Sequence, residues 1–99
     1  MIRHIALYTL TQKAHEEGLD IVIGKLDRSV KNMVDKVPGM IHAEVRKNWA
    51  EDSDHNLFFY SEFENMEVIA PYLKSDVHQA HVDMAKDYVE NKEGVDVEV

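Results

Sequence analysis

The chain has 99 residues, carries 19 acidic against 11 basic side chains for a formal net charge of −8, and contains no cysteine. Nucleic-acid binders need lysine and arginine to replace phosphate counterions, and anionic membranes repel a negative protein, so both partners are excluded. Without cysteine there is no disulfide, thiolate nucleophile or cysteine-containing zinc site. We expect a single domain over residues 1–99 in the cytoplasm, small enough to gain from burial against a second copy.

The first part of the chain predicts a strand followed by a long helix. Residues 2–10 are apolar at most positions and rich in isoleucine, leucine and tyrosine, which is typical of a strand covered on both faces. Apolar residues then recur at spacings of three and four over residues 19–37, the pattern of an amphipathic helix. Pro38-Gly39 ends this helix, because the residue before a proline is pushed out of the helical region.

Two strands follow and form a predicted hairpin. Residues 40–49 alternate between apolar and polar side chains, which indicates a strand with Ile41, Ala43 and Val45 on its covered face. Residues 57–63, LFFYSEF, indicate a second and more buried strand. The polar run between the two strands is expected to be a solvated turn.

The last part predicts a helix in two pieces and a final strand. The first piece runs from Met66 towards Lys74, with Asn65 as its N-cap, and Pro71 inside it is expected to bend or break the helix. The second piece runs from Ser75 to Gly94, where the glycine ends it. The remaining VDVEV, residues 95–99, alternates again and predicts a strand.

The predicted order is therefore strand, helix, strand, strand, helix, strand. This βαββαβ order is typical of an α+β, ferredoxin-like fold, with a four-stranded antiparallel sheet and both helices on one face. Apolar residues on both sides of the strands leave one apolar sheet face uncovered, and such a face marks an interface. We expect a homodimer that packs two of these sheets together.

Five segments carry a resemblance to a known family: MIRHIALYTL at the start, VPGM at 37–40, EVRKN at 44–48, SEFENME in the middle and VDVEV at the end. In this order and spacing they resemble the stress-responsive dimeric α/β-barrel family, Dabb, over essentially the whole chain. The resemblance implies a ferredoxin-like protomer and a dimeric α/β barrel. Most members of the family have no assigned reaction.

One branch of the family, olivetolic acid cyclase, performs an aldol condensation without metal or organic cofactor. Its catalytic tyrosine and histidine resemble Tyr72 and His78 in placement, and a histidine in its pocket resembles His4. Phe59 is at a position that faces the pocket in the family. Two departures, Ser75-Asp76 in place of a His-Pro pair and Leu57 in place of a further pocket histidine, mean that the resemblance implies the pocket rather than the cyclase reaction itself.

The stretch SDVHQAHVDM carries two histidines three positions apart. Helical metal sites more often use a spacing of four, so we expect no metal site, and His81 is interpreted as a partly exposed residue at a polar helix start. His78 lies on the core-facing stripe, where it is either bonded to a backbone carbonyl or a general base. Tyr72 either donates to a carbonyl or enolate oxygen or is an ordinary packing aromatic, and His4 is either a pocket wall or a buried, satisfied side chain.

Three functions remain open from the sequence. The first is binding of a small aromatic or polyketide-like carbonyl compound between helices and sheet, with cofactor-free acid–base chemistry by His78 and Tyr72. The second is a non-catalytic, stress-related binding or interaction scaffold of the same fold. The third is a haem-degrading or quinone-forming monooxygenase of the same barrel type, for which haem would need an axial histidine.

Overall fold

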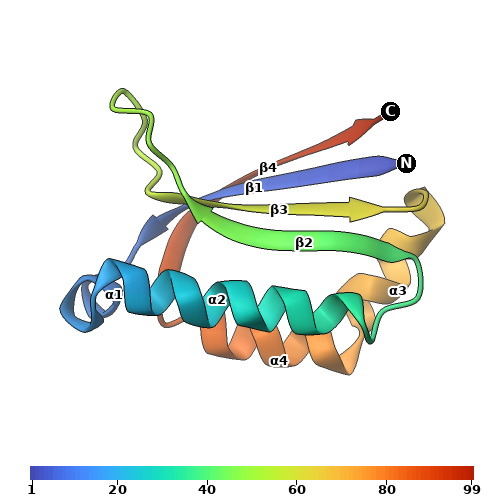
Figure 1. Cartoon of the computed structure of the whole chain (residues 1–99), viewed down its shortest axis with the longest axis horizontal. Coiled ribbons are helices and arrows are strands. Elements are labelled where there is room, and N and C mark those ends of the chain that lie inside the picture. Colours follow the sequence, from blue (N-terminus) through green and yellow to red (C-terminus); the bar gives the residue numbers. More distant parts are fainter.

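The computed structural model of all 99 residues places an antiparallel four-stranded sheet over a layer of helices (Figure 1). The sheet has the spatial order β2-β3-β1-β4 and is formed by β1 (Ile2–Leu10), β2 (Met40–Lys47), β3 (Leu57–Phe63) and β4 (Val89–Glu98). The helices are α1 (Gln12–Glu17), α2 (Leu19–Val34), α3 (Ile69–Lys74), which follows a short 3-10 turn η1 (Met66–Val68), and α4 (Asp76–Ala85). The predicted ferredoxin-like α+β fold is confirmed.

Two helices rather than one follow β1. The Thr11 side chain accepts a hydrogen bond from the Ala14 amide and starts α1, and Gly18, at a φ of 106°, turns the chain into α2. Only Ala14 is buried in α1, so this helix has no apolar period for sequence reasoning to detect. None of the helices combines the length and the apolar character needed to cross a lipid bilayer.

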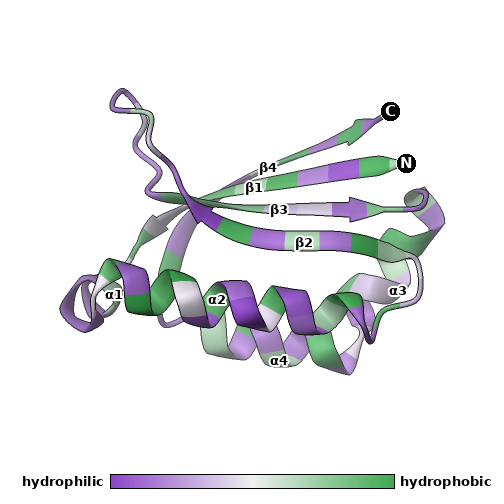
Figure 2. Ribbon diagram, in the orientation of Figure 1, coloured by the Kyte–Doolittle hydropathy of each residue, from purple (hydrophilic) through white to green (hydrophobic).

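The main core lies between α2 and the sheet. Along one face of α2 the apolar side chains are almost completely buried, and they meet inward-facing residues of β2 and β3 such as Val45 and Leu57. Figure 2 shows hydrophobic and hydrophilic positions alternating along the elements, as expected when each has one covered face. The buried residues of α2 are Val22, Leu26, Val30 and Met33.

Strand register divides the sheet residues between two faces, since residues paired across strands share a face. On the helix side, His4 is paired with Ser61 on β3 and with Asp96 on β4. On the open side, Ile5 is paired with Tyr60 and with Val95. The helices therefore cover only one face of the sheet, and apolar residues lie at the centre of the other.

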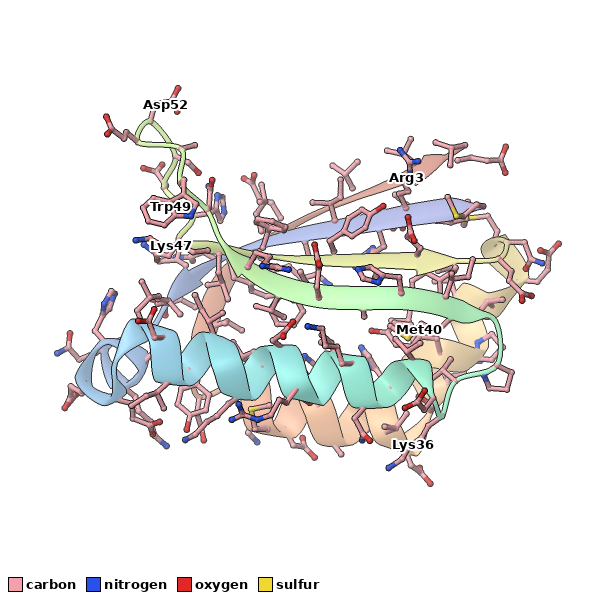
Figure 3. All side chains as sticks on the ribbon, in the orientation of Figure 1. Arg3, Lys36, Met40, Lys47, Trp49 and Asp52 are labelled. Atoms are coloured by element: carbon pink, nitrogen blue, oxygen red, sulfur yellow. The ribbon has the colours of Figure 1, made fainter.

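The first residues of β2 do not follow the predicted alternation of buried and exposed side chains. The β2–β3 register shifts between Met40 and His42, and this irregularity leaves Met40 buried while Ile41, predicted to be covered, is 47% exposed. The strand also ends at Lys47, so Trp49 lies in the hairpin loop and is 79% exposed. Figure 3 shows Trp49 on the arm that leads to Asp52, away from the helices.

The second helix breaks at Ser75, where its second piece was predicted to begin, and the bend or break expected at Pro71 does not occur. Pro71 lies in the first turn of α3, where a missing amide proton costs no helical hydrogen bond. Ser75 has an extended ψ of 150°, and its hydroxyl oxygen accepts from the His78 amide, so it ends α3 and starts α4.

The last strand is longer than the sequence indicated. We predicted a helix to Gly94, but α4 ends at Ala85 and β4 begins at Val89, so Gly94 lies inside a strand, opposite Ala6. Nearly every residue of β4 is exposed, and before Val95 its sequence shows no period that would indicate a strand. Pairing with β1, which is distant in the chain, is what makes this segment a strand.

Candidate functional site

A cavity of about 570 Å³ lies between the sheet and the α3–α4 side of the helical layer. Fourteen of its 23 lining residues are hydrophobic, a composition and size typical of sites for small organic molecules. All four residues that the sequence singled out, His4, Phe59, Tyr72 and His78, contribute to its wall. They come from β1, β3, α3 and α4, so only the folded chain brings them together.

The break at Ser75 brings Tyr72 and His78 together. The Ser75 hydroxyl donates to the Tyr72 carbonyl over 2.7 Å and accepts from the His78 amide over 3.2 Å, which fixes the angle between α3 and α4. The two rings meet edge to face, with centroids 4.6 Å apart and an interplanar angle of 62°. Aromatic rings in this arrangement attract one another, so both side chains are held in place.

Two series of rings in tilted or edge-to-face contact border the cavity. In one, Phe63 contacts Tyr72 at a centroid distance of 5.0 Å, and Tyr72 contacts His78. In the other, Phe59 lies between Tyr8, at 4.9 Å, and His81, at 5.3 Å. Each series begins on the sheet and ends at a histidine of α4, so rigid aromatic walls lead to both imidazoles.

His78 has an environment that favours the neutral imidazole. Burial lowers its pKa from the ordinary value of 6.5, and the charges of Lys92 and His4 act in the same direction, whereas the Leu73 carbonyl acts against it. Its Nδ1 has no hydrogen-bond partner and is the only fully enclosed side-chain polar atom in the chain of which this is true. A neutral histidine at this position is a competent proton acceptor at pH 7.

Tyr72 is a buried phenol that stays protonated. Burial, with a smaller contribution from Tyr8, raises its pKa to about 12. The residue is 9% exposed and lines the cavity. At any ordinary pH it is therefore a neutral hydrogen-bond donor.

His81 corrects the prediction most clearly, because it was expected to be partly exposed and is 7% exposed. Its Nδ1 lies 2.7 Å from the Ser29 hydroxyl on α2, and the residue lines the same cavity as His78. Burial lowers its pKa to about 4, with His78 adding to the effect. The only hint in the sequence is a serine on the apolar stripe of α2, and its partner is 52 positions away.

The sequence also gave no reason to select Asp96 among 19 acidic residues. The β1–β4 register places it opposite His4, and its carboxylate lies 2.5 Å from His4 Nδ1. This contact fixes the orientation of the His4 ring at the cavity wall. Nowhere in the chain do three or more histidine, aspartate or glutamate side chains approach one another closely enough to hold a metal ion.

Family comparison agrees with this architecture over almost the entire chain. The model of the Stress responsive A/B Barrel Domain family matches residues 2–99. The chain belongs to this family. Among curated proteins, none matches it in sequence.

Solved structures with the same fold come from several bacteria. A dimeric protein of unknown function from Bacteroides fragilis superposes with a TM-score of 0.83 at 23% identity, over 99% of this chain and 95% of that chain. A Dabb family protein from Mesorhizobium loti gives 0.77 at 22% identity, over 99% and 95%. A putative antibiotic biosynthesis monooxygenase from Nitrosomonas europaea gives 0.73 at 14% identity, over 100% and 98%. At these identities the similarity shows a shared fold.

Proposed function

We propose that the protein is a cytoplasmic homodimer that binds a small aromatic or polyketide-like carbonyl compound in the cavity of each protomer and exchanges a proton at the carbon next to the carbonyl. The observation that carries the proposal is His78. A buried imidazole with an unpaired ring nitrogen costs free energy, on the order of 1–3 kcal/mol, that a purely packing residue would not. Its position on the cavity wall favours a ligand-directed role.

The proposed step uses two side chains and no cofactor. His78 accepts the proton from the carbon next to the carbonyl, and the electron pair of that C–H bond moves onto the carbonyl oxygen to give an enolate. Tyr72, protonated because burial raises its pKa to about 12, donates a hydrogen bond to that oxygen. The imidazolium of His78 then returns a proton to carbon or passes it to solvent. The apolar wall and Phe59 would hold the aromatic part of the ligand.

The test uses 2-tetralone, a rigid aromatic ketone, dissolved with the protein in D₂O. Exchange of the ketone's acidic C–H for deuterium, followed by proton NMR, should be faster with protein than with buffer alone. We expect His78→Ala to lower the catalysed rate by roughly 100-fold, as for loss of a general base, and Tyr72→Phe by a smaller factor. His15→Ala, on the exposed surface of α1, is the matched control and should exchange at the wild-type rate.

Two outcomes of this experiment would contradict the proposal. Wild-type protein without catalysed exchange, and without saturable shifts of cavity resonances at millimolar ketone, would support the non-catalytic scaffold instead. If His78→Ala reduces the yield of folded protein but the remaining protein keeps its specific activity, then His78 stabilises the fold and is not the base.

The homodimer proposal rests on the open face of the sheet. The pairs Ile5–Tyr60 and Leu7–Phe58, with Val95 beside Ile5, form an apolar centre that no helix covers. Val95 is 57% exposed, so the patch is available to a second copy. The solved relative from Bacteroides fragilis is described as dimeric.

Light scattering after size-exclusion chromatography tests the dimer. We expect a mass twice that of the 11.4 kDa chain for the wild type and for Ile21→Asp, which changes an exposed apolar residue of α2. Ile5→Asp places a charge at the centre of the open face and should give the mass of one chain. A monomeric wild type at 100 μM would refute the dimer.

A monooxygenase is the second candidate, favoured by the structural match to the protein from Nitrosomonas europaea. Titration with haemin, read at the Soret band, and oxygen uptake with an aromatic quinol separate this candidate from the first. A saturable, His78-dependent Soret shift would replace proton exchange with oxygenation as the proposed function.

A further inference from the structure

We infer that His81 is a fixed, neutral hydrogen-bond donor that presents its Nε2–H to the oxygen of a ligand in the cavity, held in that tautomer by Ser29. The inference deepens the proposed function and rests on it for the nature of the ligand. It adds a second donor beside Tyr72 and gives the carbonyl oxygen a defined position.

The contact with Ser29 selects the tautomer. A neutral imidazole carries one ring proton, and the Ser29 hydroxyl lies 2.7 Å from Nδ1. A partly buried hydroxyl proton needs an acceptor, and Nδ1 is the only one that the Ser29 hydroxyl contacts. When Ser29 donates to Nδ1, the ring proton must be on Nε2.

The other side of the ring faces the cavity. His81 lines the cavity wall, and Nε2 has no hydrogen-bond partner within the chain. It is also not fully enclosed, because Nδ1 of His78 is the only enclosed polar side-chain atom that lacks a partner. Nε2–H is therefore an unpaired, not fully enclosed donor on a residue of the cavity wall.

The ring is also held mechanically. Phe59 packs against it with centroids 5.3 Å apart at 67°, and the Ser29 contact ties α4 to α2. Burial keeps the imidazole neutral at pH 7, so it donates without bringing a charge into an apolar site. A neutral imidazole donor stabilises a developing enolate without protonating it outright, and pre-oriented donors act most strongly where water is excluded.

His78 and His81 thus have different tasks although they are three residues apart. The ring of His78 contacts Tyr72, and its Nδ1 has no side-chain partner comparable to Ser29, which suits a group that gains and loses a proton. The ring of His81 is fixed by a hydroxyl and does not titrate near neutral pH. One histidine would move the proton and the other would hold the oxygen.

The first readout is the tautomer in the ligand-free protein. Two-bond proton–nitrogen spectra of protein labelled with ¹⁵N-histidine should show His81 protonated on Nε2 and bare on Nδ1 at pH 7. Ser29→Ala should convert this single tautomer into a mixture. A proton on Nδ1 in the wild type, or a spectrum that Ser29→Ala leaves unchanged, would overturn the inference.

The second readout is the ligand oxygen, probed with carbonyl-¹³C-labelled 2-tetralone. His81→Asn keeps an acceptor for Ser29 but removes the cavity donor, whereas His81→Gln places an amide N–H near the former Nε2. We expect the bound carbonyl resonance to lose part of its downfield shift in His81→Asn, with affinity about tenfold lower, and to recover in His81→Gln.

The two proposals fail separately. If wild-type protein binds and exchanges the ketone while His81→Asn does the same with an unchanged carbonyl shift, the role of His81 is refuted and the proposed function stands. If the wild type has the Nε2–H tautomer but binds no ketone, the proposal of a carbonyl ligand is refuted. The inference that Ser29 holds His81 in one tautomer then still stands.

Discussion

The two halves of the helical layer are packed very differently against the same sheet. α2 buries four apolar side chains and packs chiefly against β2, and Leu26 and Val22 have no exposed surface. α3 and α4 together bury only Tyr72, His81 and Ala85, and the cavity lies on their side. The α2 half supplies the stability of the domain, and the α3–α4 half keeps space and polar groups that a core optimised for stability would exclude.

The largest expected difference between the two halves is in the free energy of unfolding lost when one apolar side chain of each half is truncated to alanine. Leu26→Ala removes a fully buried side chain and should lower the free energy of unfolding by roughly 3 kcal/mol, since the α2 core cannot collapse to fill the hole. Val82→Ala, in α4 beside the cavity and 38% exposed, should cost less than about 0.5 kcal/mol. Urea unfolding followed by circular dichroism measures both, and equal losses would show that the halves are equally packed.

His81 makes the stability of the α3–α4 half depend on pH. The folded protein takes up a proton on His81 only near pH 4, whereas the unfolded chain does so near pH 6.5. Between these values the unfolded state binds more protons, so stability is complete above pH 6.5 and falls as the pH falls towards 4. The loss from this one group is roughly 3 kcal/mol.

Urea unfolding at pH 7 and pH 4.5 measures this loss. His81→Asn keeps a partner for Ser29 but has no ring to titrate, so its stability should fall distinctly less than that of the wild type between the two pH values. The smaller contribution of His78, whose pKa is also lowered, remains in the variant. Identical losses in both proteins would place His81 in a more hydrated environment than the structure indicates.

Gly39 lies where the two halves meet, in the turn between α2 and β2. Its φ is 87°, and a Cβ there would approach Val68 of the η1 turn to 2.5 Å. Gly39→Ala should therefore destabilise by roughly 2 kcal/mol through backbone strain and the displaced valine. Gly24→Ala is the opposite control: it lies inside α2, where alanine should stabilise by about 0.5–1 kcal/mol. Thermal unfolding would show opposite shifts of Tm.

Substitutions in the hairpin loop between β2 and β3 should leave the free energy of unfolding almost unchanged. Trp49 is 79% exposed and its main contact is Lys47, whose Nζ lies 4.0 Å from the ring centroid. Trp49→Ala should change the free energy of unfolding by no more than about 0.5 kcal/mol, the size of an exposed cation–π contact. A larger loss, measured by urea unfolding, would mean that the loop packs on the domain.

The same division explains which parts of the fold could be predicted from the sequence. The 3.6-residue period of α2 exists because one face of that helix is fully buried, so the helix was visible in the sequence. α1 buries a single alanine and has no period to detect, and of the nearly fully exposed β4 only the alternating end was predicted as a strand. β4 becomes a strand only because β1 offers it hydrogen bonds.

Only two signals in the sequence pointed to the candidate site: the core-facing stripe of the helix that carries His78, and the resemblance to a known family. His78 and Tyr72 were selected on those grounds, and the structure brings both to one cavity. The burial of His81 depends on Ser29, and the orientation of His4 depends on Asp96, contacts that span 52 and 92 positions of the chain. Such partners are set by topology, and no local pattern predicts them.

The pairing of β1 with β4 also constrains how the domain is made. β1 leaves the ribosome before the other strands of the sheet, yet one of its edges stays unpaired until β4 follows, since Ile2 is opposite Glu98. The helices and the β2–β3 hairpin can form early from local contacts, but the sheet cannot close before β4 has been synthesised. Until then, an apolar edge strand is open to pairing with other nascent chains, so the interval before β4 arrives is when this domain is most exposed to misassembly.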